Sequence, residues 1–537
     1  MFGALGPRRW VPALALIAVA AAAGGCGESA QPAAPRPVDY MPATASVAIE
    51  AAVRPGGELG QHARTTLAAL GLSSNTVRGL GGALSTPGSP QLDYGSQVAP
   101  WLGERAGLFV TAGGRRERRL LDDLLASMLG ARAGGPDVLS AGASGAVVLD
   151  ARDRAAARRF VQQRASAAGA HTQQQVDGGW LAATPGGLAF ASAGPIVAVG
   201  SAGAVGEVLA TLHGTAPLAA SSEFKTLATH APAGALAVGF AAPGAAGELP
   251  AALRGGFALV VGDSATLLSL VPGGTSISVY AEASGVQRGT AAGAQAREAF
   301  STLPGESWLA AGLGGGPAAL AGAAQALGVL SGPSSATTGS LLAEVSGPLR
   351  TLSGDSGAWA GPVGLFAAGN GLLELRAAAV LRANSRASAQ GALAQLAAAL
   401  GSQASPARVS GAERALAIHL HGLPLELVAA TGTGIDGSSD LIVGAGAASV
   451  ELALKPPQAM RGSPAAQAAR QALGGLEPTL VVDVPTLLGT LESLQVTQEP
   501  LLKGATPYLQ KVTTLDAGIG SAAPGIGRMR IVATLHA

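Results

Sequence analysis

The segment "GDSGAWAGP" at residues 354–362 contains the Gly-Asp-Ser-Gly sequence that surrounds the nucleophile of trypsin-like serine proteases. Such a serine needs a histidine that is polarised by an aspartate, on a fold of two β-barrels. His230 and Asp263 occur in the required chain order. In a chain with 7 His and 33 acidic residues, this order is easily found by chance. Ala358 also stands where a glycine ordinarily follows the Ser-Gly pair. We therefore expect a turn here and no catalytic role for Ser356.

Two further patterns could bind a cofactor or a metal. The stretch "GTGIDG" at 432–437 has the glycine spacing of a dinucleotide-binding loop, which joins a strand to a helix whose N-terminus holds pyrophosphate. The next residues, "SSDLIVGAG", read as another strand, so we predict a hairpin loop and no cofactor. His419 and His421 lie two apart on a predicted strand, as two metal ligands could, but no third ligand is evident nearby. We expect both to face solvent and predict no metal site.

The single cysteine, Cys26, follows a basic segment with Arg8 and Arg9 and an apolar stretch, "VPALALIAVAAAAGG", that is too short to span a bilayer comfortably. This order is similar to that of a bacterial lipoprotein signal peptide, in which the chain is cut before the cysteine and the thiol carries diacylglycerol. Ala23 departs from the pattern, because leucine is usual at that place. An ordinary secretory signal that is cleaved nearby is the alternative. We predict a signal peptide over 1–25 and lipidation of Cys26.

Residues 26–40 are polar and rich in proline, which predicts a tether that reaches about 40 Å at roughly 3.1 Å per residue. The folded body is expected to begin near Met41. No later stretch offers 18 continuous apolar residues, so the lipid would attach the protein to the extracytoplasmic face of the cell membrane. The formal net charge of +1 provides no long-range field for attracting nucleic acid, which we exclude as a partner.

Residues 113–135 begin with arginines and continue with leucines at helical spacing. A basic amphipathic helix of this kind can lie on anionic headgroups, and the alternative is a solvated helix packed on the protein. Asp122 and Asp123 are adjacent within it, so their carboxylates diverge and form no paired acid–base site. In the first case, the side chains at the membrane surface would be those of Arg115, Arg116, Arg118 and Arg119.

The chain also contains an internal similarity. Segments 146–165 and 378–397 are identical at nine positions, and each reads as an apolar strand, an N-cap at Asp153 or Ser385, and an Ala-rich helix. In this alignment Arg105 stands in the place of Ser356, which argues against a serine nucleophile. The flanking segments follow in the same order, as 101–110 with 352–361, 194–210 with 439–454, 230–243 with 475–488, and 261–283 with 519–537.

At 537 residues, the chain exceeds the size at which one core stops growing, so two or more domains are expected. Its runs of Val, Leu and Ala are short and are broken by Gly-Pro, Gly-Gly and Asp-Gly turns, which favours antiparallel pairing. We predict an α+β fold of two tandem duplicated modules, 41–290 and 300–537. Each would be a mainly antiparallel sheet with helices packed on one face.

Several of these segments carry a family resemblance. They are the proline-led strand openings at 42, 232 and 304, the turn at Gly103-Glu104, "LDARDRAAARRFV", "DGGWLAA", and the long segment from "IVAVGSAGAVGEVLA" to "GALAVGF". Together they resemble the uncharacterised bacterial family called domain of unknown function 3352, over nearly all of the mature chain. The resemblance implies a secreted or lipid-anchored envelope protein and brings no known activity with it.

The leading hypothesis is a non-enzymatic envelope protein whose modules bind or organise an envelope protein or wall partner. The alternative is a carrier of an apolar ligand or lipid. A hydrolase is the third reading, and it lacks a convergent acid, base and nucleophile. Aromatic residues make up only 3% of the chain, and an interior of small side chains packs closely, so we predict two solid modules without an enclosed apolar cavity.

Overall fold

The computed structural model describes residues 36–70, 94–111, 144–176, 179–245, 264–285, 287–316, 359–371, 374–419, 426–493 and 506–536. The chain divides into two compact units. The N-terminal unit holds the described residues up to Gly285, together with 522–528 and 535–536. The C-terminal unit holds the described residues from 287 to 521, together with 529–534. Residues 522–528, which the sequence comparison assigned to the second module, therefore belong to the N-terminal unit.

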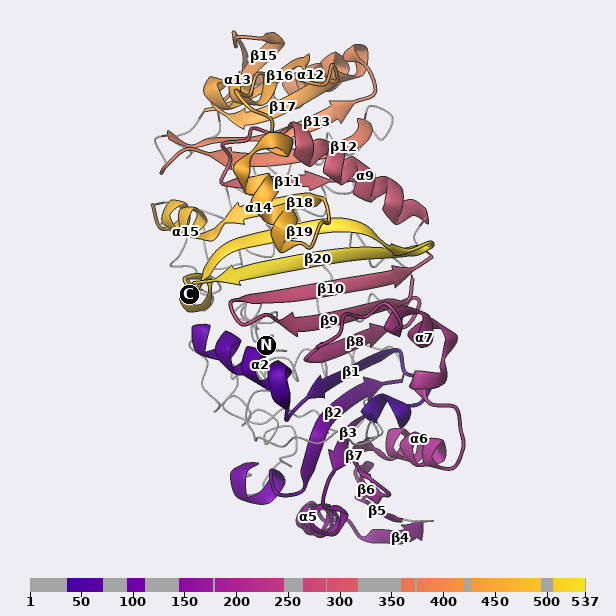
Figure 1. Ribbon diagram of the computed structural model, residues 1–537. Helices are drawn as coiled ribbons and strands as arrows, with labels where there is room; N and C mark the ends of the chain where they lie inside the picture. Colours follow the sequence, from indigo (N-terminus) through magenta and orange to yellow (C-terminus); the bar gives the residue numbers. More distant parts are fainter. Residues whose placement is uncertain are drawn as a thin grey trace. The chain divides into compact units, whose positions relative to one another are not determined.

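The N-terminal unit contains one antiparallel sheet in the order β10–β9–β8–β1–β2–β3–β7–β6–β5–β4 (Figure 1). Its strands are β1 (Val47–Ala52), β2 (Leu102–Val110), β3 (Gly145–Ala151), β4 (Thr172–Val176), β5 (Gly179–Ala183), β6 (Leu188–Ala193), β7 (Ile196–Ser201), β8 (Ala237–Ala241), β9 (Thr266–Pro272) and β10 (Ser276–Ser284). Its helices are α2 (Gly57–Ala69), α5 (Arg154–Ala167), α6 (Ala202–Leu212) and α7 (Ser222–Ala228), with short turns of helix at η2 (Pro37–Asp39), η4 (Tyr94–Val98) and η6 (Leu218–Ala220).

The C-terminal unit is also antiparallel, in the order β14–β15–β16–β17–β13–β12–β11–β18–β19. Its strands are β11 (Leu309–Leu313), β12 (Trp359–Ala368), β13 (Arg376–Ala383), β14 (Ala404–Ala407), β15 (Ala412–Ile418), β16 (Leu427–Thr433), β17 (Ser439–Ala445), β18 (Pro478–Asp483) and β19 (Val512–Ala523), and β20 (Ile526–Leu535) follows. Its helices are α9 (Gln287–Thr302), α12 (Arg386–Leu400), α13 (Ala447–Leu454), α14 (Pro464–Ala472) and α15 (Val484–Ser493), with short turns at η9 (Gly401–Gln403) and η10 (Met460–Gly462).

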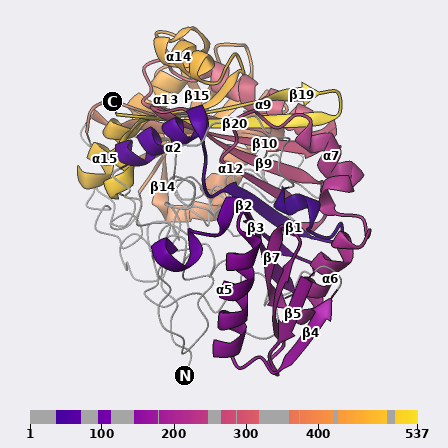
Figure 2. The same ribbon diagram turned by 60° about the horizontal axis from the view of Figure 1, so that its bottom comes forward.

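The described structure is thus α+β with antiparallel sheets, as predicted, but the helices do not share one face. In the C-terminal unit, Phe366 and Ala378 share a core with residues of α13 and α14, whereas Val363 and Leu381 share a core with residues of α12. Figure 2 likewise shows α5 and α6 on opposite sides of the strands of the N-terminal unit. Strands that are buried on both faces have continuous apolar runs without alternation. The sequence therefore did not show that helices cover both faces of the sheet.

The folded body begins before Met41. Residues 37–39 form η2, and Val38 and Met41 are 3% and 0% exposed in the core of the N-terminal unit. This core is rich in alanine and valine, and it takes in side chains of α6 and α7. The last residues of the stretch predicted to be a tether, 36–40, therefore belong to the fold.

Both predicted strand–helix units are present, and so are their N-caps. The Asp153 carboxylate accepts a hydrogen bond from the Ala156 N–H at 2.9 Å at the start of α5. The Ser385 hydroxyl accepts one from the Ser388 N–H at 3.1 Å at the start of α12. These bonds satisfy N–H groups that have no partner within the helix.

Replacement of either cap by alanine is expected to lower the free energy of unfolding by about 1 kcal/mol, because an N–H group at the helix start loses its acceptor. Urea unfolding of Asp153→Ala and Ser385→Ala measures the loss. Ser166→Ala, near the end of α5, is the control and should change stability by less than about 0.5 kcal/mol. Equal effects of Asp153→Ala and Ser166→Ala would contradict the capping role.

Candidate functional site

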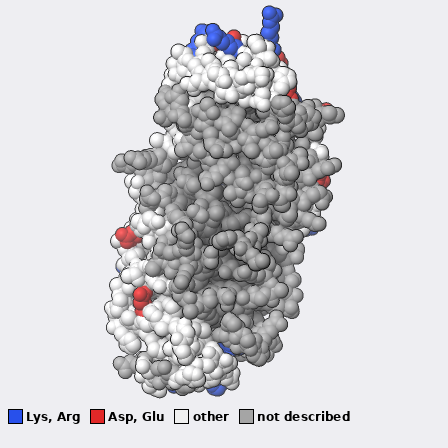
Figure 3. All heavy atoms as spheres, turned by 180° about the vertical axis from the view of Figure 1, so that it is seen from behind, with Lys and Arg blue, Asp and Glu red and all other residues white. Residues whose placement is uncertain are grey.

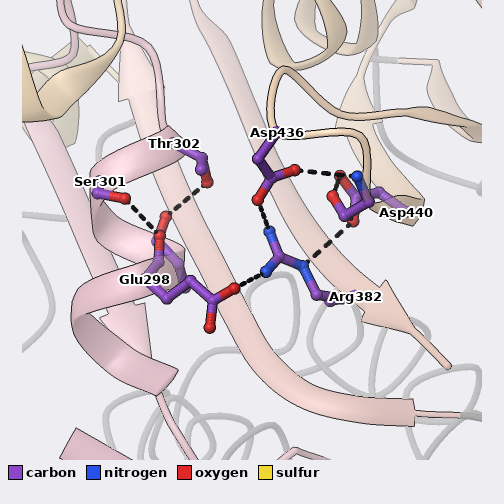
Figure 4. Close-up of polar contacts among 8 residues, drawn as sticks. Glu298, Ser301, Thr302, Arg382, Asp436 and Asp440 are labelled. Atoms are coloured by element: carbon purple, nitrogen blue, oxygen red, sulfur yellow. Dashed lines mark hydrogen bonds and ion pairs between the residues drawn. The ribbon is translucent and has the colours of Figure 1, made fainter. Parts of the chain in front are cut away.

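The densest group of charges in the C-terminal unit surrounds Arg382, near the end of β13 (Figure 4). Its guanidinium forms ion pairs with Glu298 on α9 and with Asp436 in the turn between β16 and β17. Its Nε also lies 3.9 Å from Oδ1 of Asp440 on β17. The register of β13 against β17 places Arg382 opposite Asp440, which explains why this pair meets. We refer to these four residues as the Arg382 cluster.

The acidic members of the Arg382 cluster differ in their protonation behaviour. The Asp440 side chain is only 7% exposed, and this burial raises its pKa to about 6, against the opposing effects of a Ser438 hydrogen bond and the Arg382 charge. Burial also acts to raise the pKa of Asp436, but the bonds from Ser438 and the charge of Arg382 outweigh it and lower that pKa. The cluster therefore holds three carboxyl groups and one guanidinium, with Asp440 able to take up a proton near pH 6.

The chemistry open to the Arg382 cluster is limited by its internal bonds. The Ser438 hydroxyl lies 3.0 Å from each Asp440 oxygen and donates its hydrogen bond to this carboxyl group. The more exposed carboxylates, Glu298 and Asp436, each hold the guanidinium. The cluster joins a helix, a strand and a hairpin turn, and we assign it a structural role rather than a catalytic one.

The "GTGIDG" stretch forms the hairpin between β16 and β17, as predicted. Its glycines have packing roles. A Cβ at Gly432 would lie 2.5 Å from Cδ2 of Leu454, and one at Gly434 would lie 2.4 Å from Oδ2 of Asp440. Gly437 has a φ of +81°, which other residues rarely adopt. In the N-terminal unit, Gly194 and Pro195 alone separate β6 from β7.

The candidate histidines are not brought to a common site within the described structure. His419 directly follows β15, is exposed, and has its Nε2 3.4 Å from Oε1 of Glu426, while His421 lies outside the described residues. His230 follows the end of α7, and its carbonyl accepts a hydrogen bond from Arg528 at 2.6 Å. Within the described ranges, no group of three or more His, Cys, Asp or Glu side chains could hold a metal ion.

Several candidate residues lie outside the described residues, and the structure does not test them. One argument about Ser356 was nevertheless wrong. Phe109 pairs with Ala146, and Phe366 pairs with Ala378, so the strand pairing aligns 109 with 366 rather than with 360. Arg105 is therefore not the counterpart of Ser356. The untested residues are Cys26, Arg115, Arg116, Arg118, Arg119, Asp122, Asp123, Asp263 and Ser356.

A second buried ion pair lies in the N-terminal unit. The Glu282 side chain on β10 is fully buried, and its Oε1 accepts a hydrogen bond from Nε of Arg528 at 3.0 Å. Burial raises the pKa of Glu282 to about 7, against the opposing charge and hydrogen bond of Arg528. The same guanidinium lies 5.9 Å from the centre of the Tyr280 ring, within range of a cation–π contact.

A third buried acid holds the start of the folded chain. The Glu50 side chain on β1 is fully buried, and its Oε1 lies 3.0 Å from Nε of Arg36 and 2.6 Å from a terminal nitrogen of Arg105. Its Oε2 accepts a hydrogen bond from the Val38 N–H at 3.3 Å. The sequence analysis missed Glu50, Glu282 and Arg382. The available signal was a charged residue inside an apolar strand, as in "SVAIEAA" and "SVYAEAS".

Among the described residues, we find no helix with the length and hydrophobicity needed to cross a membrane. No family model matches the chain, and no curated protein matches it, so the resemblance to domain of unknown function 3352 stays a prediction. A solved structure titled "Structure of crystal form I of TP0453" is similar over 48% of this chain and 80% of that chain, at 9% identity and a TM-score of 0.27. A likeness of this size supports no conclusion about fold or function.

Proposed function

We propose that the chain is a lipid-anchored protein of the bacterial cell envelope that acts as a non-enzymatic binding or structural module. The signal-like N-terminus and Cys26 support the location. The non-enzymatic part is carried by one observation, that two fully buried carboxylates and one largely buried guanidinium are held in ion pairs within the fold. Glu50, Glu282 and Arg382 each join separate strands or helices. On the face in Figure 3, the described Lys and Arg side chains lie mainly at the upper end of the view.

We further propose that 41–290 and 300–537 arose by duplication. Strand registers support this, because Ala146 pairs with Phe109 and Gly200, while Ala378 pairs with Phe366 and Gly444. A glycine two residues before each phenylalanine leaves space for a side chain of the segment that precedes the first strand. A Cβ at Gly107 would lie 2.2 Å from Cε of Met41, and a Cβ at Gly364 would lie 2.7 Å from Cδ2 of Leu303.

The segment before the first strand of each unit makes a similar contact as well. Pro42 forms an isolated bridge with Pro217, just before η6, and Pro304 forms one with Ala459, just before η10. An experimental structure tests the duplication. The units should superpose along β1–β3 with β7 and β11–β13 with β17, and a different strand order in either unit would contradict it.

If the Cys26 thiol carries lipid, Cys26→Ala should leave the signal uncleaved or release the protein from the membrane fraction, because alanine provides no thiol for diacylglycerol. Detergent phase partitioning of cell extracts measures the change. Ser29→Ala, three residues further along, is the matched control and should partition like the unaltered protein. Unchanged partitioning of Cys26→Ala would refute lipidation.

The binding role is tested by using the lipidated chain to capture partners from solubilised membranes, with the Cys26→Ala protein as the comparison. An envelope protein or wall fragment that is retained at a fixed ratio would support the role. Labelling of Ser356 by a serine-directed fluorophosphonate would contradict the non-enzymatic assignment. For the alternative role as a carrier, mass spectrometry of lipid extracts from the purified chain is the measurement, and a lipid at near-equal ratio would favour it.

A further inference from the structure

Helix α5 carries four arginines and no acidic residue. Phe160, Val161 and Arg164 are buried on its inner side, and the Phe160 ring lies 5.1 Å from that of Trp101. The remaining arginines lie towards the outside, where Arg154 and Arg159 are exposed and Arg158 is half-buried. The outer side of α5 is therefore basic.

This arrangement does not help the helix to fold. Arg154 lies in the first turn, where a positive charge opposes the helix dipole. Arg154 and Arg158 are four residues apart, so their like charges repel each other. In the part of the chain that the structure describes, no carboxylate forms an ion pair with Arg154, Arg158 or Arg159. These three arginines are therefore available to an anionic partner outside the protein.

Helix α12, in the second strand–helix unit, provides an internal comparison. Its one charged residue is Arg386, whose Nε lies 2.7 Å from Oε2 of Glu413. The remainder of α12 is made of alanine, leucine, glutamine, serine and glycine. Of the two corresponding helices, only α5 therefore has a basic outer side, and α5 belongs to the N-terminal unit.

Arg36, the first described residue, lies near the N-terminus of α5. Arg36 is bonded to Glu50 at 3.0 Å, and Glu50 is bonded to Arg105 at 2.6 Å. The neighbouring Glu104 N–H donates to Oδ2 of Asp150 at 3.2 Å, and α5 begins four residues after Asp150. These contacts place Arg36 and the start of α5 close together.

Two further facts limit the distance between α5 and a membrane that holds Cys26. Burial raises the pKa of the Tyr40 phenol and the charge of Arg154 opposes this rise, so Arg154 also lies near the start of the described chain. Arg36 lies ten positions after Cys26. Such a segment spans at most about 35 Å.

We propose that the exposed arginines of α5 bind the anionic headgroups of the phospholipid membrane to which the chain is anchored. The proposal rests on the lipid anchor proposed above, which keeps α5 within reach of the surface. Guanidinium groups suit phosphate because they stay charged and donate paired hydrogen bonds. Contact of α5 with the headgroups would hold the N-terminal unit against the membrane surface, instead of leaving it free on its tether.

The test uses residues 27–537, which lack the cysteine, so that lipidation plays no part. Co-sedimentation measures partitioning onto phosphatidylcholine vesicles and onto vesicles with about one quarter phosphatidylglycerol. The test variant combines Arg154→Gln, Arg158→Gln and Arg159→Gln. The control variant combines Arg408→Gln, Arg414→Gln and Arg461→Gln, which removes the same charge from exposed sites of the C-terminal unit. Thermal unfolding confirms that each protein is folded.

We expect the unaltered chain to prefer the anionic vesicles. The test variant should bind them about 100-fold more weakly, since each arginine near an anionic surface contributes about 1 kcal/mol. The control variant should bind like the unaltered chain. Equal binding to both vesicle types, or an equal loss in the control variant, would overturn the proposal. Failure of the lipid anchor would appear separately, in the partitioning of Cys26→Ala in cells.

Discussion

Arg528→Gln is expected to lower the free energy of unfolding by about 3 kcal/mol at pH 8, because it leaves the buried Glu282 carboxylate without its positive partner. At pH 5 the loss should be smaller by about 1 kcal/mol, because Glu282, with a pKa of about 7, is then protonated in the folded state. Urea unfolding at both pH values measures the difference. An equal loss at pH 5 and pH 8 would show that the charge on Glu282 is not what Arg528 compensates.

The free energy of unfolding of the unaltered protein should also depend on pH, because of Glu282. Burial raises the pKa of this group from 4.5 to about 7, so the folded state binds its proton more tightly than the unfolded state. The free energy of unfolding therefore falls as the pH rises from about 4.5 to about 7 and levels off above that. Glu282→Gln should remove about 2 kcal/mol of the fall between pH 5 and pH 8. Glu492→Gln, at an exposed residue of α15, is the control and should leave the fall unchanged.

Glu50→Ala is expected to cost about 3 kcal/mol of unfolding free energy. The substitution removes the acceptor shared by Arg36, Arg105 and the Val38 N–H, and it leaves a cavity beneath η2. Urea unfolding at neutral pH measures the cost. Glu58→Ala, on the exposed side of α2, is the matched control and should change stability by less than about 0.5 kcal/mol.

A double replacement separates the charge of Glu50 from its packing. Glu50→Met combined with Arg105→Met removes Glu50 and one of its two arginine partners and keeps apolar volume, so it should be more stable than Glu50→Ala. If Glu50→Ala alone were as stable as its Glu58 control, the bonds at Glu50 would not hold the start of the fold. If the double variant were no more stable than Glu50→Ala, the unpaired charge of Arg105 would not account for the loss.

Much of the local structure could be predicted from the sequence. The strand–helix units at 146–165 and 378–397 and their N-caps depend on residues a few positions apart, and the structure confirms them. The hairpin at "GTGIDG" was predictable for the same reason, because the residues after it read as a strand. The lipid anchor at Cys26 and the duplication remain predictions of the sequence that experiments must test.

The register between distant segments was not predictable. The alignment of 101–110 with 352–361 was displaced, because Ala-rich and Gly-rich segments match one another at several offsets. The expectation of helices on one face was wrong because β13 is buried on both sides. In both cases, weakly patterned apolar strands left more than one arrangement compatible with the sequence.

By itself, the sequence determined the composition of the core, the capped helices, the hairpin turns and the signal-like N-terminus, because each depends on neighbouring residues. Only the tertiary structure decided which charges meet. Arg528 lies 246 positions from Glu282, and Arg382 lies 84 positions from Glu298. These pairs form because the order of strands in a sheet brings distant segments together, and a buried charge is stable only where that order supplies a partner.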